Sequence, residues 1–249
     1  MSGGGYREVR RPDRRDTEVP AVPRVGKLAP WLMWALAAPA AAQQVRLGGQ
    51  VRPRYESRDA GVQPRDAFTT TRVRADLTAA LDRGIGAFIQ VQGVRLWGEQ
   101  ISTVADARSA DFGLHQGYVD LTTDGAFNVT ARVGRQELSF AEERLMGSLD
   151  WSQQARAFDG VRFSVRGKPG TVDLFGAKLA DPSAPGVSND AEFAGGYAQF
   201  SGVGAHALDL YALYQRSAGI GTREATLGGR AVGKPGFAEY RVEGAYQLG

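Results

Sequence analysis

Arginine recurs at alternate positions in several stretches of the chain, and this spacing carries the clearest chemistry in the sequence. Arg52 and Arg54, for example, alternate with the apolar residues Val51 and Tyr55. A guanidinium group stays charged and binds a carboxylate through two parallel hydrogen bonds. A row of such groups on one face therefore predicts a surface that attracts anions. The arginines in this polar phase are Arg46, Arg52, Arg54, Arg72, Arg74, Arg132, Arg162 and Arg166.

Each of these arginines has an alternative role, which is to pair with an acid on the same face. A polar surface in contact with water carries charges of both signs, so a single arginine is more often paired with an acid than free to bind a ligand. For the whole set we nevertheless expect at least one arginine to contact a bound anion. The candidate partners are Glu56, Asp76, Asp120 and Asp173.

Acidic residues gather in and beside the longest irregular segment, residues 137–155. Two carboxylates at a suitable separation can act as acid and base on a glycosidic bond. Such an enzyme would also need a cleft for its substrate, and the spacing of these acids does not indicate one. We therefore expect salt bridges that hold the segment in place, and no enzyme. His115 and His206 stand far apart and the chain has no cysteine, so we expect no metal and no cofactor. The acids are Glu137, Glu142, Glu143, Asp150 and Asp159.

The elements that must position these side chains are β-strands, because apolar and polar residues alternate with a period of two. Turn signals such as Asp82-Arg83-Gly84 and Asp124-Gly125 divide the chain into about eleven stretches. Short turns alternate with longer loops between these stretches. No stretch has a clear helical period, so one domain is expected. The predicted strands are Val45–Glu56, Thr69–Leu81, Ile85–Trp97, Gln116–Thr122, Asn128–Gln136, Phe158–Arg166, Val172–Leu179, Glu192–Ser201, His206–Gln215, Ala225–Val232 and Phe237–Leu248.

Residues 1–42 have the composition of a leader. Lys27 precedes an apolar run from Leu28 to Ala42, which is shorter than the roughly 20 residues of a spanning helix and ends in small residues. We expect a signal peptide that is cleaved after Ala42, with residues 1–26 explained by a start assigned too far upstream. The leader carries seven of the 30 Lys/Arg and four of the 27 Asp/Glu, so residues 43–249 have a net charge of zero and no nucleic-acid partner is expected.

The alternation alone is also typical of a soluble β-sandwich. The leader and the arginines on the polar faces favour a transmembrane antiparallel β-barrel in the bacterial outer membrane, with an apolar outside in contact with lipid and a charged inside. A mean hydropathy of −0.29 argues against a bundle of membrane helices. Residues 43–249 are thus expected to form an all-β barrel domain. Because bacterial barrels have even strand numbers, about eleven strands suggest an incomplete barrel, and we expect the chain to be a fragment.

Three motifs fall in order around the long irregular segment, namely Gly134–Leu138, Glu143–Leu145 and Arg156–Arg162. Together they resemble the alginate-export family of outer-membrane porins. Weaker similarity lies in Gln116–Leu121, Leu208–Tyr214 and Val242–Gln247.

The resemblance implies a monomeric barrel of about eighteen strands, of which this chain supplies the N-terminal part, with an arginine-rich constriction that passes an anionic polysaccharide. By the same resemblance the candidate pore-lining residues are Arg135, Arg162, Arg144 and Arg156. Strict alternation places Arg135 on the face of Val133, so it points inward only if Gly134 forms a bulge.

The function expected from these observations is a diffusion pore for an anionic, alginate-like oligo- or polysaccharide. A low-dielectric wall would focus the field of the lumen arginines on such a ligand. The alternatives are a less selective porin for small organic anions and, with less support, an outer-membrane carbohydrate-active enzyme. Besides the transported anion, we expect the protein to contact outer-membrane lipid.

Overall fold

The computed structural model describes residues 44–58, 66–98, 112–180, 190–204, 206–219 and 221–249. The predicted leader and its cleavage site lie outside these residues. All described strands belong to one compact unit, Ala40–Gly249. No helix among the described residues is long and apolar enough to cross a membrane.

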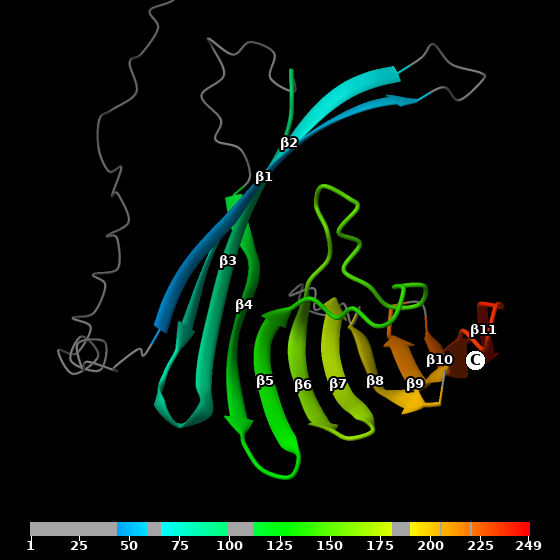
Figure 1. Cartoon of the computed structure of the whole chain (residues 1–249). Helices are drawn as coiled ribbons and strands as arrows, with labels where there is room; N and C mark the ends of the chain where they lie inside the picture. Colours follow the sequence, from blue (N-terminus) through cyan, green and yellow to red (C-terminus); the bar gives the residue numbers. More distant parts are fainter. Residues whose placement is uncertain (1–43, 59–65, 99–111, 181–189, 205, 220) are drawn as a thin grey trace, which may run out of the picture. The chain divides into compact units, whose positions relative to one another are not determined.

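Within the described residues, eleven strands form one antiparallel sheet in which neighbours in sequence are neighbours in space (Figure 1). This confirms the all-β antiparallel fold and the predicted number of strands. β1 and β11 are the two edges of the described sheet, so closure into a barrel stays a prediction. The strands are β1 (Gln44–Arg58), β2 (Asp66–Ala80), β3 (Ile85–Leu96), β4 (Phe112–Thr123), β5 (Asn128–Gln136), β6 (Phe158–Gly167), β7 (Gly170–Ala180), β8 (Ala191–Val203), β9 (His206–Ser217), β10 (Thr222–Gly233) and β11 (Tyr240–Leu248).

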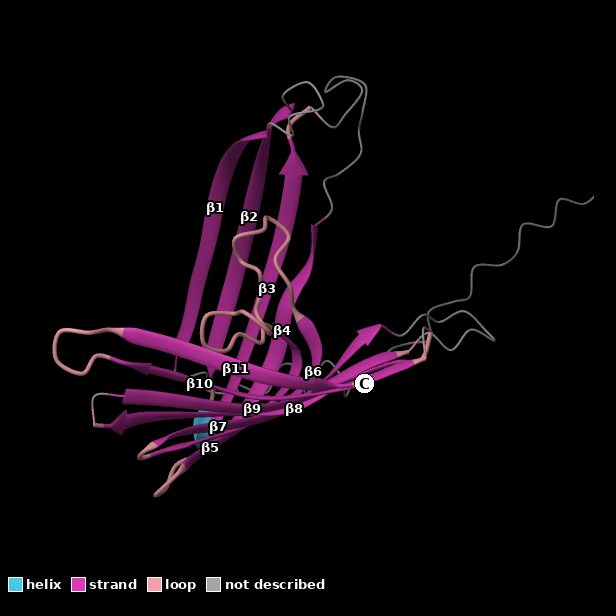
Figure 2. Cartoon of the chain, turned by 90° about the vertical axis from the view of Figure 1, so that its right-hand side faces the viewer, coloured by secondary structure: helices cyan, strands magenta, loops and turns pink. Residues whose placement is uncertain are grey.

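The predicted bounds agree with the observed ones to within a few residues. β5 matches at both ends, whereas β4 begins at Phe112 instead of Gln116 and β11 begins at Tyr240 instead of Phe237. The late start of β11 has a local cause, because the backbone N–H of Ala238 bonds to the carbonyl of Pro235 and extends the turn. The tight turn after β2 is a short 3-10 helix, Asp82–Gly84, drawn in cyan in Figure 2.

The sheet has two faces of opposite character, as the alternation predicted. On one face, here called the apolar face, large apolar side chains lie exposed, from Leu47 and Val51 in β1 to Phe163 in β6 and Leu227 in β10. On the other face the most buried side chains are polar. They are Arg72, Gln136, Asp173 and Asp209. An exposed apolar surface that spans successive strands is expected of a sheet that contacts lipid.

The segment between β5 and β6, residues 137–157, lies on the polar face. We call it the β5–β6 loop. Because the loop covers the polar face of the sheet, this polar face is also called the loop face. Leu138, Phe140 and Met146 of this loop are buried together with Tyr197 and Tyr211 of the sheet. The ring of Phe140 lies 4.6 Å from that of Tyr197, which lies 5.6 Å from that of Tyr211. The apolar core of the molecule therefore lies between this loop and strands β6–β9.

Candidate functional site

Arginines of β1 and β2 hold one part of the β5–β6 loop against the sheet. The side chain of Arg72 is fully buried, and its guanidinium lies 3.0 Å from the carboxylate of Asp150 and donates to the backbone carbonyls of Asp150 and Ser152. Arg74 donates to the same carboxylate at 3.1 Å. Arg52 donates to the carbonyls of Asp150 and Trp151 at 2.7 and 2.8 Å. These three arginines thus anchor the loop to the N-terminal strands.

The environment of Asp150 favours its charged form. Partial burial raises the pKa of its carboxyl, but the hydrogen bond from Arg72 and the charges of Arg72, Arg74 and Arg52 outweigh this effect. The net result is a pKa below the ordinary value. The anchor therefore remains ionised well into the acidic range.

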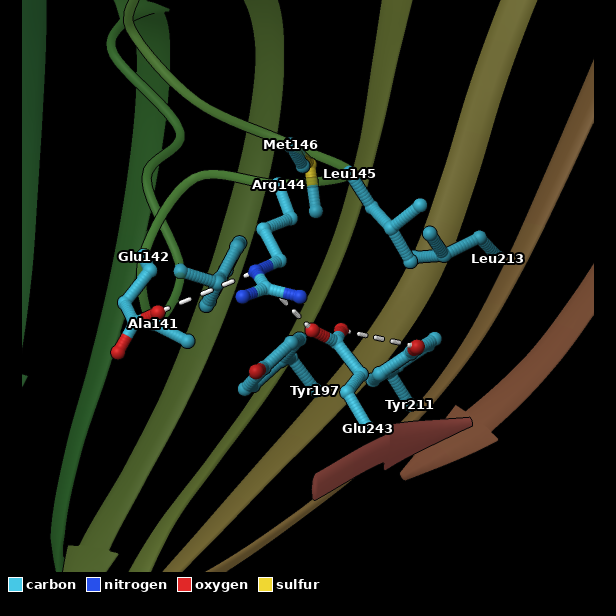
Figure 3. A pocket seen from close by; sticks show the side chains of 10 residues that line it. Ala141, Glu142, Arg144, Leu145, Met146, Tyr197, Tyr211, Leu213 and Glu243 are labelled. Atoms are coloured by element: carbon cyan, nitrogen blue, oxygen red, sulfur yellow. Dashed lines mark hydrogen bonds and ion pairs between the residues drawn. The ribbon is translucent and has the colours of Figure 1, made fainter. Parts of the chain in front are cut away.

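A second group of charges holds the other part of the loop against the C-terminal strands. Glu142 accepts from Arg230 of β10 at 2.7 Å and pairs with Arg241 of β11 at 2.9 Å. Arg144 points toward Glu142 and toward Glu243 of β11, at 3.9 and 3.7 Å (Figure 3). Because Asp150 and Glu142 contact opposite ends of the strand order, the loop crosses the loop face from β1–β2 to β10–β11.

The backbone of the loop indicates that these contacts fix it. Ala141, Glu143, Leu149 and Ala155 all have positive φ, between 48° and 58°. For residues with a Cβ this left-handed conformation is unfavourable, and it persists where the surrounding structure imposes it. The loop is thus a constrained element.

A basic recess on the loop face lies beside the loop, between β4, β5 and β6. It has a volume of about 250 Å³ and is lined by three arginines, Arg132, Arg162 and Arg166, by hydroxyls of threonine and serine, and by one acid, Asp120. Its position follows from the register, because Arg132 stands opposite both Asp120 in β4 and Arg162 in β6.

The three arginines of this recess differ in their partners. Arg132 donates to both carboxylate oxygens of Asp120, at 2.7 and 2.8 Å. Arg162 donates to the buried Asp173 at 2.9 Å. Arg166 is exposed, and within the described part of the chain it has no ion pair or hydrogen bond from its side chain. Two guanidinium groups are therefore largely neutralised, and the third is left available for an external anion.

The comparison with protein families gives a match to the alginate export family over residues 43–249. The chain belongs to this family. The resemblance predicted from the motifs is thereby confirmed, and with it the description of the chain as an outer-membrane transport protein.

Solved structures similar to this member of the alginate export family include mutants of the porin of Rhodopseudomonas blastica. A triple mutant of that porin is 15% identical, with 83% of this chain and 95% of that chain covered and a TM-score of 0.28. A second mutant is 12% identical, with 82% of this chain and 99% of that chain covered and a TM-score of 0.29. The comparison with curated proteins gives no match.

The structure places four of the predicted pore-lining arginines under the loop of this alginate-export-family chain. Arg52, Arg72 and Arg74 lie on the loop face as the alternation predicts, but their guanidinium groups contact the loop. Arg54 likewise donates to the carbonyl of Trp151 and pairs with Glu56 at 3.2 Å. The ion-pair alternative describes these four residues better than contact with a bound anion.

The placement of Arg135 corrects the family-based expectation. Neither ladder of β5 has a register shift at Gly134, so Arg135 remains in phase with Val133 and stands opposite Asp159. The two side chains pair at 2.6 Å. Arg135 therefore lies on the apolar face, because the bulge that would turn it inward is not formed.

The remaining candidates lie in the β5–β6 loop. Arg144 is one of the loop anchors described above, whereas the side chain of Arg156 is exposed and has no partner within the described ranges. The expectation that acids hold this segment is confirmed for Glu142 and Asp150. Asp159 instead pairs on the apolar face.

Sequence reasoning missed the role of His115. Its side chain is buried, and Nε2 lies 2.7 Å from Glu137 and 3.0 Å from Arg74. The histidine therefore belongs to the polar contacts that support the loop. The available signal was its position directly after the apolar Leu114, which is exposed on the other face. The described residues contain no group of three or more metal ligands.

Proposed function

We propose that this chain forms a diffusion pore in the bacterial outer membrane that passes anionic oligo- or polysaccharides of the alginate type, without a chemical step. The protein would act as a monomer, with its apolar face in contact with lipid and its loop face along the aqueous passage. Family membership supports the transport role, and the charges on the loop face support the preference for anions.

The observation that carries this proposal is the basic recess around Arg166. A polyuronate has one carboxylate per sugar, and a guanidinium without a protein partner is suited to bind such a group in a two-pronged contact. Arg132 and Arg162 are held in position by Asp120 and Asp173, so Arg166 supplies the net positive charge of the recess. Rings or patches of arginine are a common basis of anion selectivity in pores.

The β5–β6 loop also contributes to selectivity in this proposal. It is anchored to strands at both ends of the strand order, so it would narrow the passage next to the recess. A narrow passage between low-dielectric walls strengthens the field of the arginines, which raises the local concentration of the matching anion. The loop and the recess together would thus set selectivity.

The test is ion selectivity in a planar bilayer, measured as the reversal potential in a salt gradient. Arg166→Gln should lower the anion preference, because it removes the unpaired guanidinium and leaves the Arg132–Asp120 and Arg162–Asp173 pairs intact. Arg135→Gln is the matched control, because this arginine lies on the apolar face, and it should leave the reversal potential unchanged. An unchanged potential for Arg166→Gln would contradict the proposal.

Block by an oligo-uronate separates the leading function from a less selective porin for small organic anions. A pore for a polyuronate should show brief current blocks when a hexa-uronate is added, and Arg166→Gln should shorten them. A general anion porin would conduct acetate and show no blocks. Release of shorter sugars from the polymer would instead indicate an enzyme.

A further inference from the structure

Trp151 is exposed on the β5–β6 loop although the backbone around it is firmly held. Its side chain is 68% exposed, and within the described residues the indole has no hydrogen bond and no ring contact. Large aromatic side chains are usually buried, and an indole N–H usually has a partner when it is. The indole of Trp151 is therefore open to contact with an external partner.

The contacts of the neighbouring residues exclude simple mobility of this segment. The carbonyl of Trp151 accepts from both Arg52 and Arg54. The carbonyl of Ser152 accepts from Arg72 at 3.2 Å. The side-chain amide of Gln153 donates to Thr70 at 2.8 Å and accepts from Arg52 at 3.0 Å. The indole thus projects from a rigid support, and a ligand would not have to order it.

The indole borders a recess on the loop face above the arginine anchor. The recess has a volume of about 680 Å³, within the range of roughly 300–1,000 Å³ typical of ligand pockets. Phe68, Val94 and Leu96 line it together with the indole, and amide groups of glutamines complete it. A surface that combines an aromatic plane with amides matches a sugar ring, which has an apolar C–H face and a rim of hydroxyls.

The charges of this recess favour a sugar ring over a free anion. Arg54 and Glu56 both line it, and they pair with each other at 3.2 Å. The recess therefore differs from the basic recess around Arg166, where basic groups outnumber acids. The side-chain amide of Gln154 also lines it and has no partner within the described ranges, so it is available to sugar hydroxyls.

We propose that Trp151 is a stacking platform for a pyranose ring, and that its recess binds oligosaccharides through the ring rather than through a carboxylate. This inference rests on the proposed function in one respect, namely that the loop face lines a passage for saccharides. It adds a second, charge-independent contact to that passage. Neutral and acidic sugars should both bind at Trp151, whereas only acidic ones should respond to Arg166.

The experiment measures tryptophan emission of the full chain in detergent during titration with maltohexaose and, separately, with a hexa-uronate. Stacking should shift the emission of Trp151 to shorter wavelength and protect it from acrylamide. Trp97 is the matched control, since it is 63% exposed at the end of β3 and outside the recess. The difference between Trp97→Phe and the Trp97→Phe/Trp151→Phe double variant isolates the signal of Trp151.

The expected result is a shift with both sugars in the wild type and in Trp97→Phe, and no shift in the double variant. Trp151→Ala should weaken binding of maltohexaose roughly tenfold, the loss expected from one aromatic contact. A shift that persists in the double variant would overturn the proposal.

Two further outcomes separate this inference from the proposed function. If Trp151 does not respond to either sugar while a hexa-uronate still blocks the anion current, the stacking platform is wrong and the anion pore stands. If Trp151 responds to maltohexaose while the reversal potential shows no anion preference, the platform stands and the anion pore is wrong.

Discussion

At Asp150 the guanidinium groups of Arg72, Arg74 and Arg52 converge at 3.0, 3.1 and 3.8 Å. This carboxylate is half exposed, yet it has three cationic neighbours from two strands. Because its pKa in the folded protein lies below that in the unfolded chain, its contribution to stability is present above the unfolded value of about 3.9 and is lost as pH falls through the folded value. Loop anchoring should therefore be insensitive to pH near neutrality.

Asp150→Asn should loosen the loop at neutral pH, because it removes the negative charge of the side chain and keeps its shape. Amide hydrogen exchange in residues 148–153 should become faster in this variant. In the wild type these residues should lose protection, relative to the intrinsic exchange rate at the same pH, only below about pH 3.9. Equal exchange rates in the variant and the wild type at pH 7 would show that the carboxylate does not anchor the loop.

The sequence predicted the face of most arginines correctly and their partners less well. The alternation placed Arg72 and Arg74 on the polar face, because side-chain direction in a strand depends only on period. It could not predict that both groups would contact Asp150, which is more than 70 positions away. For Arg135 the alternation was right, and the family-based expectation of a lumen position was wrong.

The β5–β6 loop is the element that joins the two ends of the described sheet. Its apolar side chains pack on aromatic residues of β7–β9, and its acids pair with arginines on both sides. The sequence indicated a long irregular segment with acids. It did not predict the packing, although Leu138, Phe140 and Met146 are apolar and Tyr197 and Tyr211 fall in the phase of the polar face. Apolar residues in that phase were the missed signal.

Phe140→Ala should release the loop from the sheet. The ring is 5% exposed and stacks on Phe175 and Tyr197, and loss of a buried phenylalanine typically costs about 3–5 kcal/mol. The strands keep the backbone hydrogen bonds between them, so the sheet should stay folded. The effect should therefore appear as faster tryptic cleavage at Arg144 and Arg156 in the folded protein. Leu145→Ala in the same loop is the control, since Leu145 is 55% exposed. Similar cleavage rates for the two variants would contradict this account.

At the scale of the whole molecule the two faces of the sheet contact different surroundings. The apolar face contacts lipid in the proposed function, and the loop face contacts water and the loop. The alternation of apolar and polar residues determines which side chains lie on each face. The sequence therefore predicted the strands and their two faces well. The crossing of the loop depends on contacts as far as 101 positions apart, such as that between Arg52 and Gln153. No local period contains information on such pairs.

Adjacent substitutions in β10 test this assignment of faces. Leu227→Arg places a charge on the apolar face, where arginine near the middle of a bilayer costs about 2–4 kcal/mol. Thr226→Arg places the same charge on the loop face, near Glu224, and should cost much less. The measurement is the free energy of unfolding from lipid vesicles. Equal losses for the two variants would mean that both faces contact the same medium.

The two-sided anchoring of the β5–β6 loop has a consequence for the order of folding. One anchor needs β1 and β2, and the other needs β10 and β11, so neither the first nor the last strands alone can hold the loop. Contacts between residues so distant in sequence form late, since the intervening chain must be ordered first. During biogenesis we therefore expect a wide, poorly selective intermediate, which narrows only when its last described strands have paired.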